Sequence, residues 1–419
     1  MIEHLAVKGY RLFRDFETKL QPGINVLIGA NASGKSSLFE LLRIIQSCCL
    51  GSIRRGIELR PVPGEVFHPG GELAIVWGIT LALSRSNAGK PLRRCLHSIE
   101  IEGCPAPARI TGEALSRLES RRKRSSRGQQ EYSDELRECG LIEPEPPYQV
   151  LSSRYYERGK VSEGASSVPQ ELGPAESLLS RATDPRLRDS WRFRNAVLGW
   201  RLYCDLQVSR VAALRAPQPL GGGEALDENG DNLASVLLSL FTNLDYQEQR
   251  EDFLRFVRAA VPEFDTLAPT PDSTSNHVVL QWVERGLKTK LSAADLSDGV
   301  LRLLILGAIC CNPHPPTLIC IDEPEIGLHP KVLPLVGGLL RRASQRSQVI
   351  VLTHSPEMLQ GMPIESIAVM RKENGEARIV WPNDHELLRE IVTDEVAGER
   401  EVNYDRLGEA FLSGELDQL

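Results

Sequence analysis

The stretch that most constrains the fold is residues 24–45, which read INVLIGANASGKSSLFELLRII. It starts as a short apolar strand, passes through a Gly-rich loop and continues as an amphipathic helix. The loop, residues 29–36, matches the pattern G-x-x-x-x-G-K-[ST]. A strand before this pattern and a helix after it are the context in which it forms a phosphate-binding loop, or P-loop. We therefore expect an α/β fold with a mixed, largely parallel sheet around the P-loop.

The P-loop predicts how phosphates would be bound. Its glycines let backbone N–H groups curl around a phosphate, and the helix N-terminus adds partial positive charge. Lys35 is a point charge for the β- and γ-phosphates, and the Ser36 hydroxyl is a ligand for Mg²⁺, so the expected cofactors are ATP and Mg²⁺. The alternative is a chance match or a decayed site. The residues expected to line the nucleotide site here are Gly29, Ala30, Asn31, Ala32, Ser33, Gly34, Lys35, Ser36 and Ser37.

A second motif is the segment TLICIDEPE, residues 317–325, an apolar strand that ends in two acids. A strand tip would place Asp322 beside the metal ion. The next carboxylate, Glu323, can accept a proton from an attacking water. The alternative is a strand that ends in solvated acids.

A third motif is QVIVLTHSP, residues 348–356, another apolar strand, which ends at Thr353 and His354. A single histidine is often structural, but this one ends a strand of parallel type that follows the acidic motif. We expect His354 to sense the γ-phosphate, so the predicted catalytic residues are Glu323, His354 and Lys35.

The segment DLSDGVLR, residues 295–302, opens an apolar helix with polar residues. Ser297 is a good N-cap, and Asp298 suits the first turn. Gly299 is harder to explain, since a glycine inside a helix costs about 1 kcal/mol relative to alanine. A simple reading is a capped core helix; the other is that Gly299 permits the close approach of a bulky group.

The P-loop together with LSDG, IDEPEIGLHP and VLTHSP resembles the ABC-type ATPases of the RecF/SMC/OLD branch, and within it the small stand-alone bacterial predicted AAA ATPases. The resemblance implies an ABC-ATPase head. It also implies that Ser297 and Gly299 form a signature motif, which closes over the ATP held by another copy in a homodimer. His329, in GLHP, stands where ABC transporters carry an aspartate, which argues against a transporter subunit.

We expect three segments: residues 1–104 as the first part of the ATPase head with the P-loop, 105–270 as a mainly helical insertion, and 271–419 as the second part with the signature, acidic motif and switch histidine. The insertion holds the basic run RRKRSSR, residues 121–127. This run is either a solvated helix with internal ion pairs or an arm that tracks DNA phosphates. A Q-loop glutamine is not identified, because Gln46 lies too close to the P-loop helix.

Composition limits the function. The 49 Lys and Arg against 56 Asp and Glu give a net charge of −7, which does not favour nucleic acid over the whole surface. The sequence shows no membrane span and no signal-peptide core, and its nine cysteines contain no CxxC, so we expect a cytoplasmic protein with reduced core thiols.

The predicted function is an ATP-hydrolysing switch in DNA maintenance or phage defence. Alternatives are a regulatory or scaffold ATPase that controls a partner nuclease or toxin, and a transporter coupling subunit.

Overall fold

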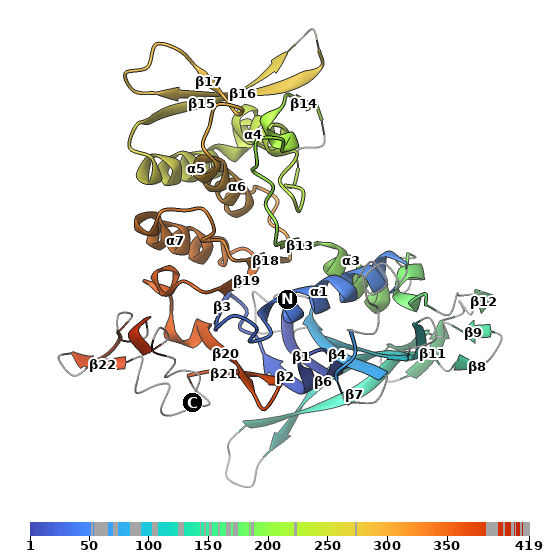
Figure 1. Ribbon diagram of the computed structural model, residues 1–419. Coiled ribbons are helices and arrows are strands. Elements are labelled where there is room, and N and C mark those ends of the chain that lie inside the picture. The colour runs from blue at the N-terminus through green and yellow to red at the C-terminus, as the bar shows by residue number, and fades with distance from the viewer. Residues whose placement is uncertain are drawn as a thin grey trace. The chain divides into compact units, whose positions relative to one another are not determined.

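The chain forms two compact units in the computed structural model (Figure 1). Unit 1 comprises Met1–Pro22, Ala32–Trp200 and Arg371–Ile379, and unit 2 comprises Gly23–Asn31, Arg201–Met370 and Val380–Leu419. The structure describes residues 1–51, 53, 66–69, 74–83, 94–102, 108–124, 130–142, 144–145, 148–150, 153–157, 160–164, 169–170, 175–183, 185, 188–221, 224–272, 275–382, 393–396, 399–403, 406, 408–410 and 413.

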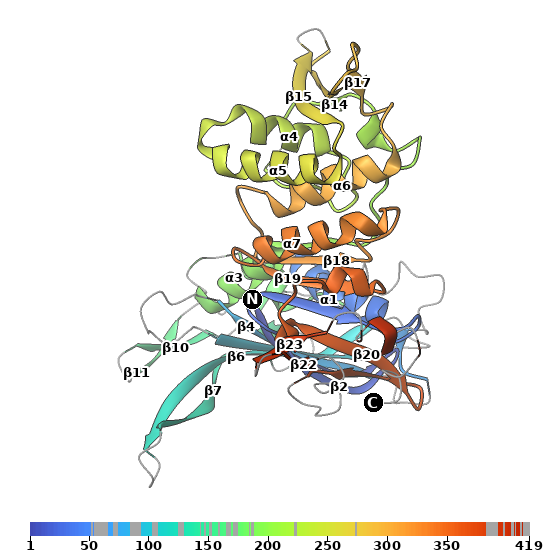
Figure 2. The same cartoon turned by 90° about the vertical axis from the view of Figure 1, so that its left-hand side faces the viewer.

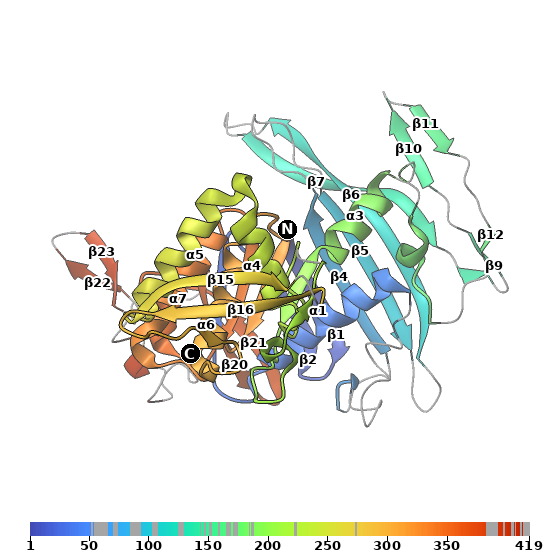
Figure 3. The same ribbon diagram turned by 90° about the horizontal axis from the view of Figure 1, so that it is seen from above.

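Unit 1 is built on a six-stranded antiparallel sheet with the order β2-β1-β4-β5-β6-β7. Two helices lie side by side across this sheet, as Figure 3 shows for α1 and α3. The elements are β1 (Ile2–Tyr10), β2 (Phe13–Lys19), α1 (Lys35–Leu50), β4 (Ala74–Ala82), β5 (Arg94–Glu102), β6 (Arg109–Arg124), β7 (Gln130–Ile142), β8 (Pro144–Glu145), β9 (Tyr148–Val150), β10 (Ser153–Glu157), β11 (Lys160–Gly164), β12 (Pro169–Gln170), η2 (Leu178–Arg181) and α3 (Arg188–Leu198).

The expectation of a mainly helical insertion is wrong for residues 109–170. The residues described there form strands β6 to β12, and helices appear only from η2 onward. The sequence of β6, RITGEALSRLESRRKR, is rich in residues that favour helices, but pairing with β5 and β7 decides its conformation. Of the basic run, residues 121–124 therefore lie in β6, while 125–127 fall outside the described residues. The boundaries at 104 and 270 stay a prediction.

Unit 2 contains the expected parallel sheet. Five neighbouring strands have the order β13-β18-β19-β3-β20, and β18, β19, β3 and β20 pair in parallel. All five residues of β3 are buried, as expected for a strand covered on both faces. The strands are β3 (Ile24–Ile28), β13 (Trp200–Tyr203), β18 (Leu318–Asp322), β19 (Gln348–Thr353) and β20 (Ile367–Glu373). Strand β21 (Glu376–Val380) follows β20, and its residues up to Ile379 belong to unit 1.

Helices and a second sheet complete unit 2. Figures 1 and 2 show α4, α5 and α6 between the β14-β16-β15 sheet and α7. Edge strand β15 carries Pro269 and Pro271, which cannot donate hydrogen bonds to another chain. The elements are η3 (Ala213–Arg215), β14 (Gln218–Pro219), α4 (Leu233–Thr242), η4 (Leu244–Tyr246), α5 (Gln247–Ala260), β15 (Phe264–Asp272), β16 (His277–Glu284), β17 (Leu291–Ser292), α6 (Asp298–Cys310), η5 (Pro330–Val332), α7 (Leu333–Ala343), η6 (Pro356–Leu359), η7 (Ile364–Ser366), β22 (Thr393–Val396) and β23 (Glu399–Val402).

Two cysteine pairs lie in the cores, as expected. Cys48 and Cys49 are buried in α1, and Cys310 and Cys311 are buried at the end of α6. Burial raises the pKa of the Cys311 thiol to about 12 and the pKa of Cys310 well above its usual value. These thiols are therefore held in their unreactive, protonated form. Among the described helices, none is both long and apolar enough to span a membrane.

Candidate active site

Three motif-bearing strands of unit 2 end at one edge of the parallel sheet. In the register, Asp322 of β18 pairs with Leu352 of β19, and Thr353 of β19 pairs with Ile28 of β3. The carboxyl ends of parallel strands are the place where α/β sheets bind ligands. The residues that directly follow these strands, Gly29, Glu323 and His354, therefore start from the same edge.

The P-loop joins β3 to α1. Ala32 and Gly34 have left-handed backbone conformations, with φ of 62° and 109°. Alternation of left- and right-handed residues turns successive N–H groups toward one side, and such a concave backbone binds anions. Lys35 is buried, and its Nζ donates to Ser33 Oγ at 3.4 Å, while Ser36 is exposed.

Arg11 lies against the first turns of α1 in unit 1. Its Nη1 donates to Glu40 Oε2 at 2.5 Å and to Ser37 Oγ at 3.4 Å. Its backbone is left-handed, with φ of 47°, and its amide donates to Val66 O at 3.0 Å. The structure thus holds an arginine beside the residue that follows Ser36.

The structure brings Glu323 and His354 together. His354 Nε2 lies 3.1 Å from Glu323 Oε1, and both side chains are partly exposed. Glu323 has a left-handed backbone with φ of 49°, which is strained for a residue with a side chain. Its amide donates to Leu352 O at 2.8 Å, so the strained turn is fixed to the neighbouring strand. This arrangement presents a carboxylate and an imidazole to the same space.

Glu325 is a residue that the sequence analysis missed. Its Oε1 accepts hydrogen bonds from Thr353 Oγ1 and from the backbone N of His354, both at 2.7 Å. Within the described residues, its Oε2 is buried without a hydrogen-bond partner. Glu325 therefore fixes the backbone from which His354 projects. The available signal was the second glutamate of the DEPE sequence, residues 322–325.

The predicted signature residues lie at the start of α6. Ser297 is the N-cap, since its Oγ accepts from Val300 N at 3.3 Å. A Cβ atom on Gly299 would lie 3.2 Å from the backbone oxygen of Gly327. The group that lies close to Gly299 in the structure thus belongs to the same chain. Packing against Gly327 explains why a glycine stands at this position. The approach of a bulky ligand to Gly299 stays a prediction.

Two glutamines bear on the missing Q-loop. Gln46 Nε2 donates to the backbone oxygen of Trp200 at 3.1 Å and to that of Val197 at 3.5 Å, which is a structural role inside unit 1. Gln207 is exposed and follows β13, the strand beside β18 in the sheet. Its backbone N donates to Asn229 O at 3.3 Å. The position of Gln207 after the strand beside β18 makes it a candidate for this role.

Comparison with known proteins identifies the family. Residues 148–359, about half of the 419 residues, match the family described as "AAA domain, putative AbiEii toxin, Type IV TA system". The chain belongs to this AAA-domain family. Residues 1–48 match the family described as "AAA ATPase domain".

Curated relatives match over shorter stretches. The Nod factor export ATP-binding protein I of Rhizobium leguminosarum bv. viciae is 32% identical over 121 residues, 28% of this chain and 36% of that protein. The DNA replication and repair protein RecF of Lacticaseibacillus casei (strain BL23) is 39% identical over 77 residues, 17% of this chain and 21% of RecF. The chain thus spans about a third of the length of the first relative and about a fifth of the length of RecF.

Among solved structures, the SmcHead bound to the C-winged helix domain of ScpA is similar in fold, with a TM-score of 0.50 and 13% identity. The similarity covers 90% of this chain and 97% of that one. The family match and the relatives support an ABC-type P-loop ATPase of the RecF-like kind, and the similarity to the SmcHead confirms the expected fold class.

Proposed function

We propose that this protein is an ATP-binding and ATP-hydrolysing molecular switch. The observation that carries the proposal is the pairing of Glu323 with His354 at 3.1 Å, on the sheet edge where the P-loop begins. In this proposal, Glu323 accepts a proton from the attacking water, His354 contacts the γ-phosphate, and Lys35 neutralises phosphate charge.

The residues available for Mg²⁺ are the carboxylate of Asp322 and the hydroxyl of Ser36. Both offer the hard oxygen atoms that Mg²⁺ prefers, and both are accessible rather than buried. When bound with ATP, Mg²⁺ neutralises charge on the phosphates. Gln207 is our candidate for the Q-loop glutamine, because it follows the strand next to Asp322.

Two substitutions test the chemistry. Lys35→Ala should abolish tight ATP binding, because the phosphates lose their compact cation. Glu323→Gln should retain binding and lose turnover by about 10²- to 10⁴-fold, because an amide cannot accept the proton. Binding of a fluorescent ATP analogue and release of phosphate are measured side by side. Normal hydrolysis by the Glu323→Gln protein would refute the role of Glu323 as the base.

We further propose that ATP joins two copies of the chain, with Ser297 and Gly299 of one copy facing the nucleotide of the other. The support is the N-terminus of α6, which begins after the cap residue Ser297 and offers the positive end of the helix dipole to an anion. Sedimentation of the Glu323→Gln protein should show a dimer with ATP and a monomer without it. A strict monomer that hydrolyses ATP well would exclude this arrangement.

The process that the switch serves is either DNA repair and maintenance or phage defence. The RecF relative supports the first, and the family description, which names a putative toxin, supports control of a partner nuclease or toxin.

For DNA, the candidate contact is the basic part of β6. Fluorescence anisotropy should show a slope of log K against log salt of about −3 to −4 on duplex DNA, one unit per phosphate. Unchanged affinity after Arg121, Arg122, Lys123 and Arg124 are replaced by alanine would reject this contact.

A further inference from the structure

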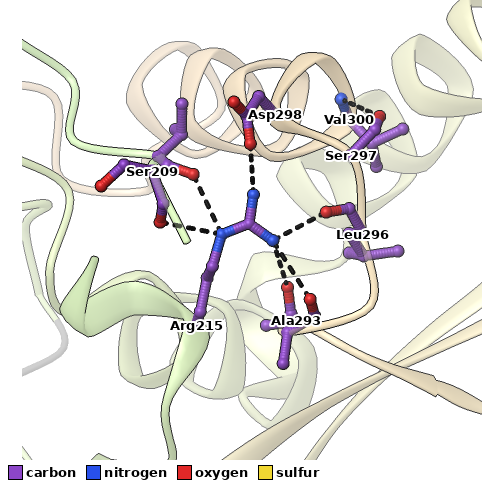
Figure 4. Close-up of polar contacts among 9 residues, drawn as sticks. Ser209, Arg215, Ala293, Leu296, Ser297, Asp298 and Val300 are labelled. Carbon is purple, nitrogen blue, oxygen red and sulfur yellow. Dashed lines mark hydrogen bonds and ion pairs between the residues drawn. The ribbon is translucent and has the colours of Figure 1, made fainter. Parts of the chain in front are cut away.

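Arg215 connects two loops of unit 2 at the start of the signature helix. It ends the short helix η3, and its side chain is only 7% exposed although it carries a charge. Figure 4 shows its guanidinium between the loop that follows β13 and the turn that precedes α6. A buried arginine has to be satisfied by several acceptors, because burial of an unpaired charge is costly.

All three nitrogens of the guanidinium donate hydrogen bonds. Five acceptors are backbone carbonyl oxygens, and the sixth is a carboxylate. Nε donates to Val208 O at 2.9 Å and Ser209 O at 3.0 Å, Nη1 to Leu296 O at 2.7 Å and to Ala293 O and Ala294 O at 3.3 Å each, and Nη2 to Asp298 Oδ1.

The contact with Asp298 has an electrostatic consequence. Asp298 is the first residue of α6, and its side chain is 61% exposed. A carboxylate at this position interacts favourably with the helix N-terminus and repels any other anion that approaches. The guanidinium of Arg215 neutralises this carboxylate and holds it by a charge-assisted hydrogen bond. The N–H groups of α6 then remain attractive to a phosphate.

We propose that Arg215 is a positioning residue for the signature motif. It fixes the turn before Ser297, offsets the charge of Asp298, and ties both to the loop that follows Gln207. The inference rests on the proposed function, in which the signature of one copy meets the ATP of another. Arg215 itself does not contact the nucleotide.

The geometry requires an arginine. Its planar guanidinium provides five N–H donors in a fixed fork, which matches acceptors on two loops and on Asp298 at once. A lysine has three donors on one nitrogen, so it retains the charge near Asp298 but cannot reach both loops. The effects of alanine and lysine at this position therefore separate charge from geometry.

The test uses full-length protein with four variants: Arg215→Ala, Arg215→Lys, the double variant Arg215→Ala/Asp298→Asn, and the control Arg210→Ala. Arg210 is an exposed arginine of the same loop. Steady-state ATP hydrolysis gives kcat and KM. ATP affinity is measured in the Glu323→Gln background, and thermal unfolding reports whether each variant is folded.

Arg215→Ala should lower kcat by up to about 100-fold, which is the effect of misplacing a group that acts in the reaction. ATP affinity should be unchanged, because the P-loop is intact. Arg215→Lys should fall between Arg215→Ala and the wild type. Asp298→Asn should restore part of the kcat lost in Arg215→Ala, because it removes the uncompensated charge.

Two results would overturn the proposal: a kcat for Arg215→Ala equal to that of Arg210→Ala, or a parallel loss of kcat and thermal stability that Asp298→Asn does not relieve. A wild-type protein without ATPase activity would instead reject the proposed function itself. The two failures are thus distinguishable.

Discussion

Glu325 holds the residue that we propose as the phosphate sensor. One carboxylate oxygen accepts from both Thr353 Oγ1 and His354 N, and Thr353 is fully buried. Removal of the acceptor leaves two donors without a partner, and each buried unsatisfied group costs about 1–3 kcal/mol.

We therefore expect Glu325→Ala to lower the free energy of unfolding by at least about 1 kcal/mol and to reduce kcat, because His354 loses its fixed backbone. Glu325→Gln is the matched control, since the amide oxygen can accept the same two hydrogen bonds. Chemical denaturation and phosphate release measure both effects. If the alanine variant were as stable and as active as the glutamine variant, these hydrogen bonds would not matter.

Among the contacts of single residues, some could be predicted from the sequence and others could not. The Ser297 cap is local, three residues from its partner, and the structure confirms it. The sequence placed Glu323 and His354 each at the end of a strand, but their contact at 3.1 Å was not predicted and appears only in the structure. Arg215 and Glu325 were missed because Asp298, the partner of the first, and Thr353, the partner of the second, lie 83 and 28 residues away, and no local pattern indicates such a contact.

Among the elements, helix α7 contains two adjacent glycines with different surroundings. A Cβ atom on Gly337 would lie 2.8 Å from the backbone oxygen of Met358 in η6, whereas a Cβ atom on Gly338 would have no neighbour within 4 Å. The first glycine permits the close packing of α7 on η6. The second only increases the backbone entropy of the unfolded chain.

Gly337→Ala should therefore destabilise the protein by about 1–3 kcal/mol, the usual effect of overpacking a rigid contact. Gly338→Ala should stabilise it by up to about 1 kcal/mol, because alanine favours the helix. Urea denaturation of the two variants, compared with the wild type, measures both changes. Equal shifts in the same direction would show that the contact with Met358 does not constrain α7.

The strand conformation of β6 could not be predicted from the sequence of that segment. The parallel strands β3, β18 and β19 could be predicted because continuous apolar runs leave few alternatives. In β6, arginines, leucines and glutamates suggest a helix, and only the pairing of Arg109–Arg124 with β5 and β7 reveals a strand. Pairing partners distant in sequence are not visible in the segment itself.

For the whole molecule, the order of motifs along the chain was the most informative signal. The P-loop, the signature, the acidic strand end and the switch histidine predicted an ABC-type fold, which the family match and the SmcHead similarity confirm. No motif predicted that the chain would divide into two units, with β3 in unit 2 and α1 in unit 1. That division depends on long-range packing.

In the proposed function, the complete ATPase site takes its P-loop from one copy and its signature from another. The most direct measurement mixes two inactive variants, Lys35→Ala and Ser297→Arg, and follows phosphate release. Lys35→Ala lacks the phosphate cation, and Ser297→Arg places bulk where the shared phosphate would lie.

In an equal mixture of the two variants, half of the dimers contain one copy of each variant. Each of these mixed dimers has one intact site of two, made of the P-loop of the Ser297→Arg copy and the signature of the Lys35→Ala copy. The expected rate is thus about a quarter of the wild-type rate, far above that of either variant alone. A mixture no more active than the sum of its two components would contradict a site shared between two copies.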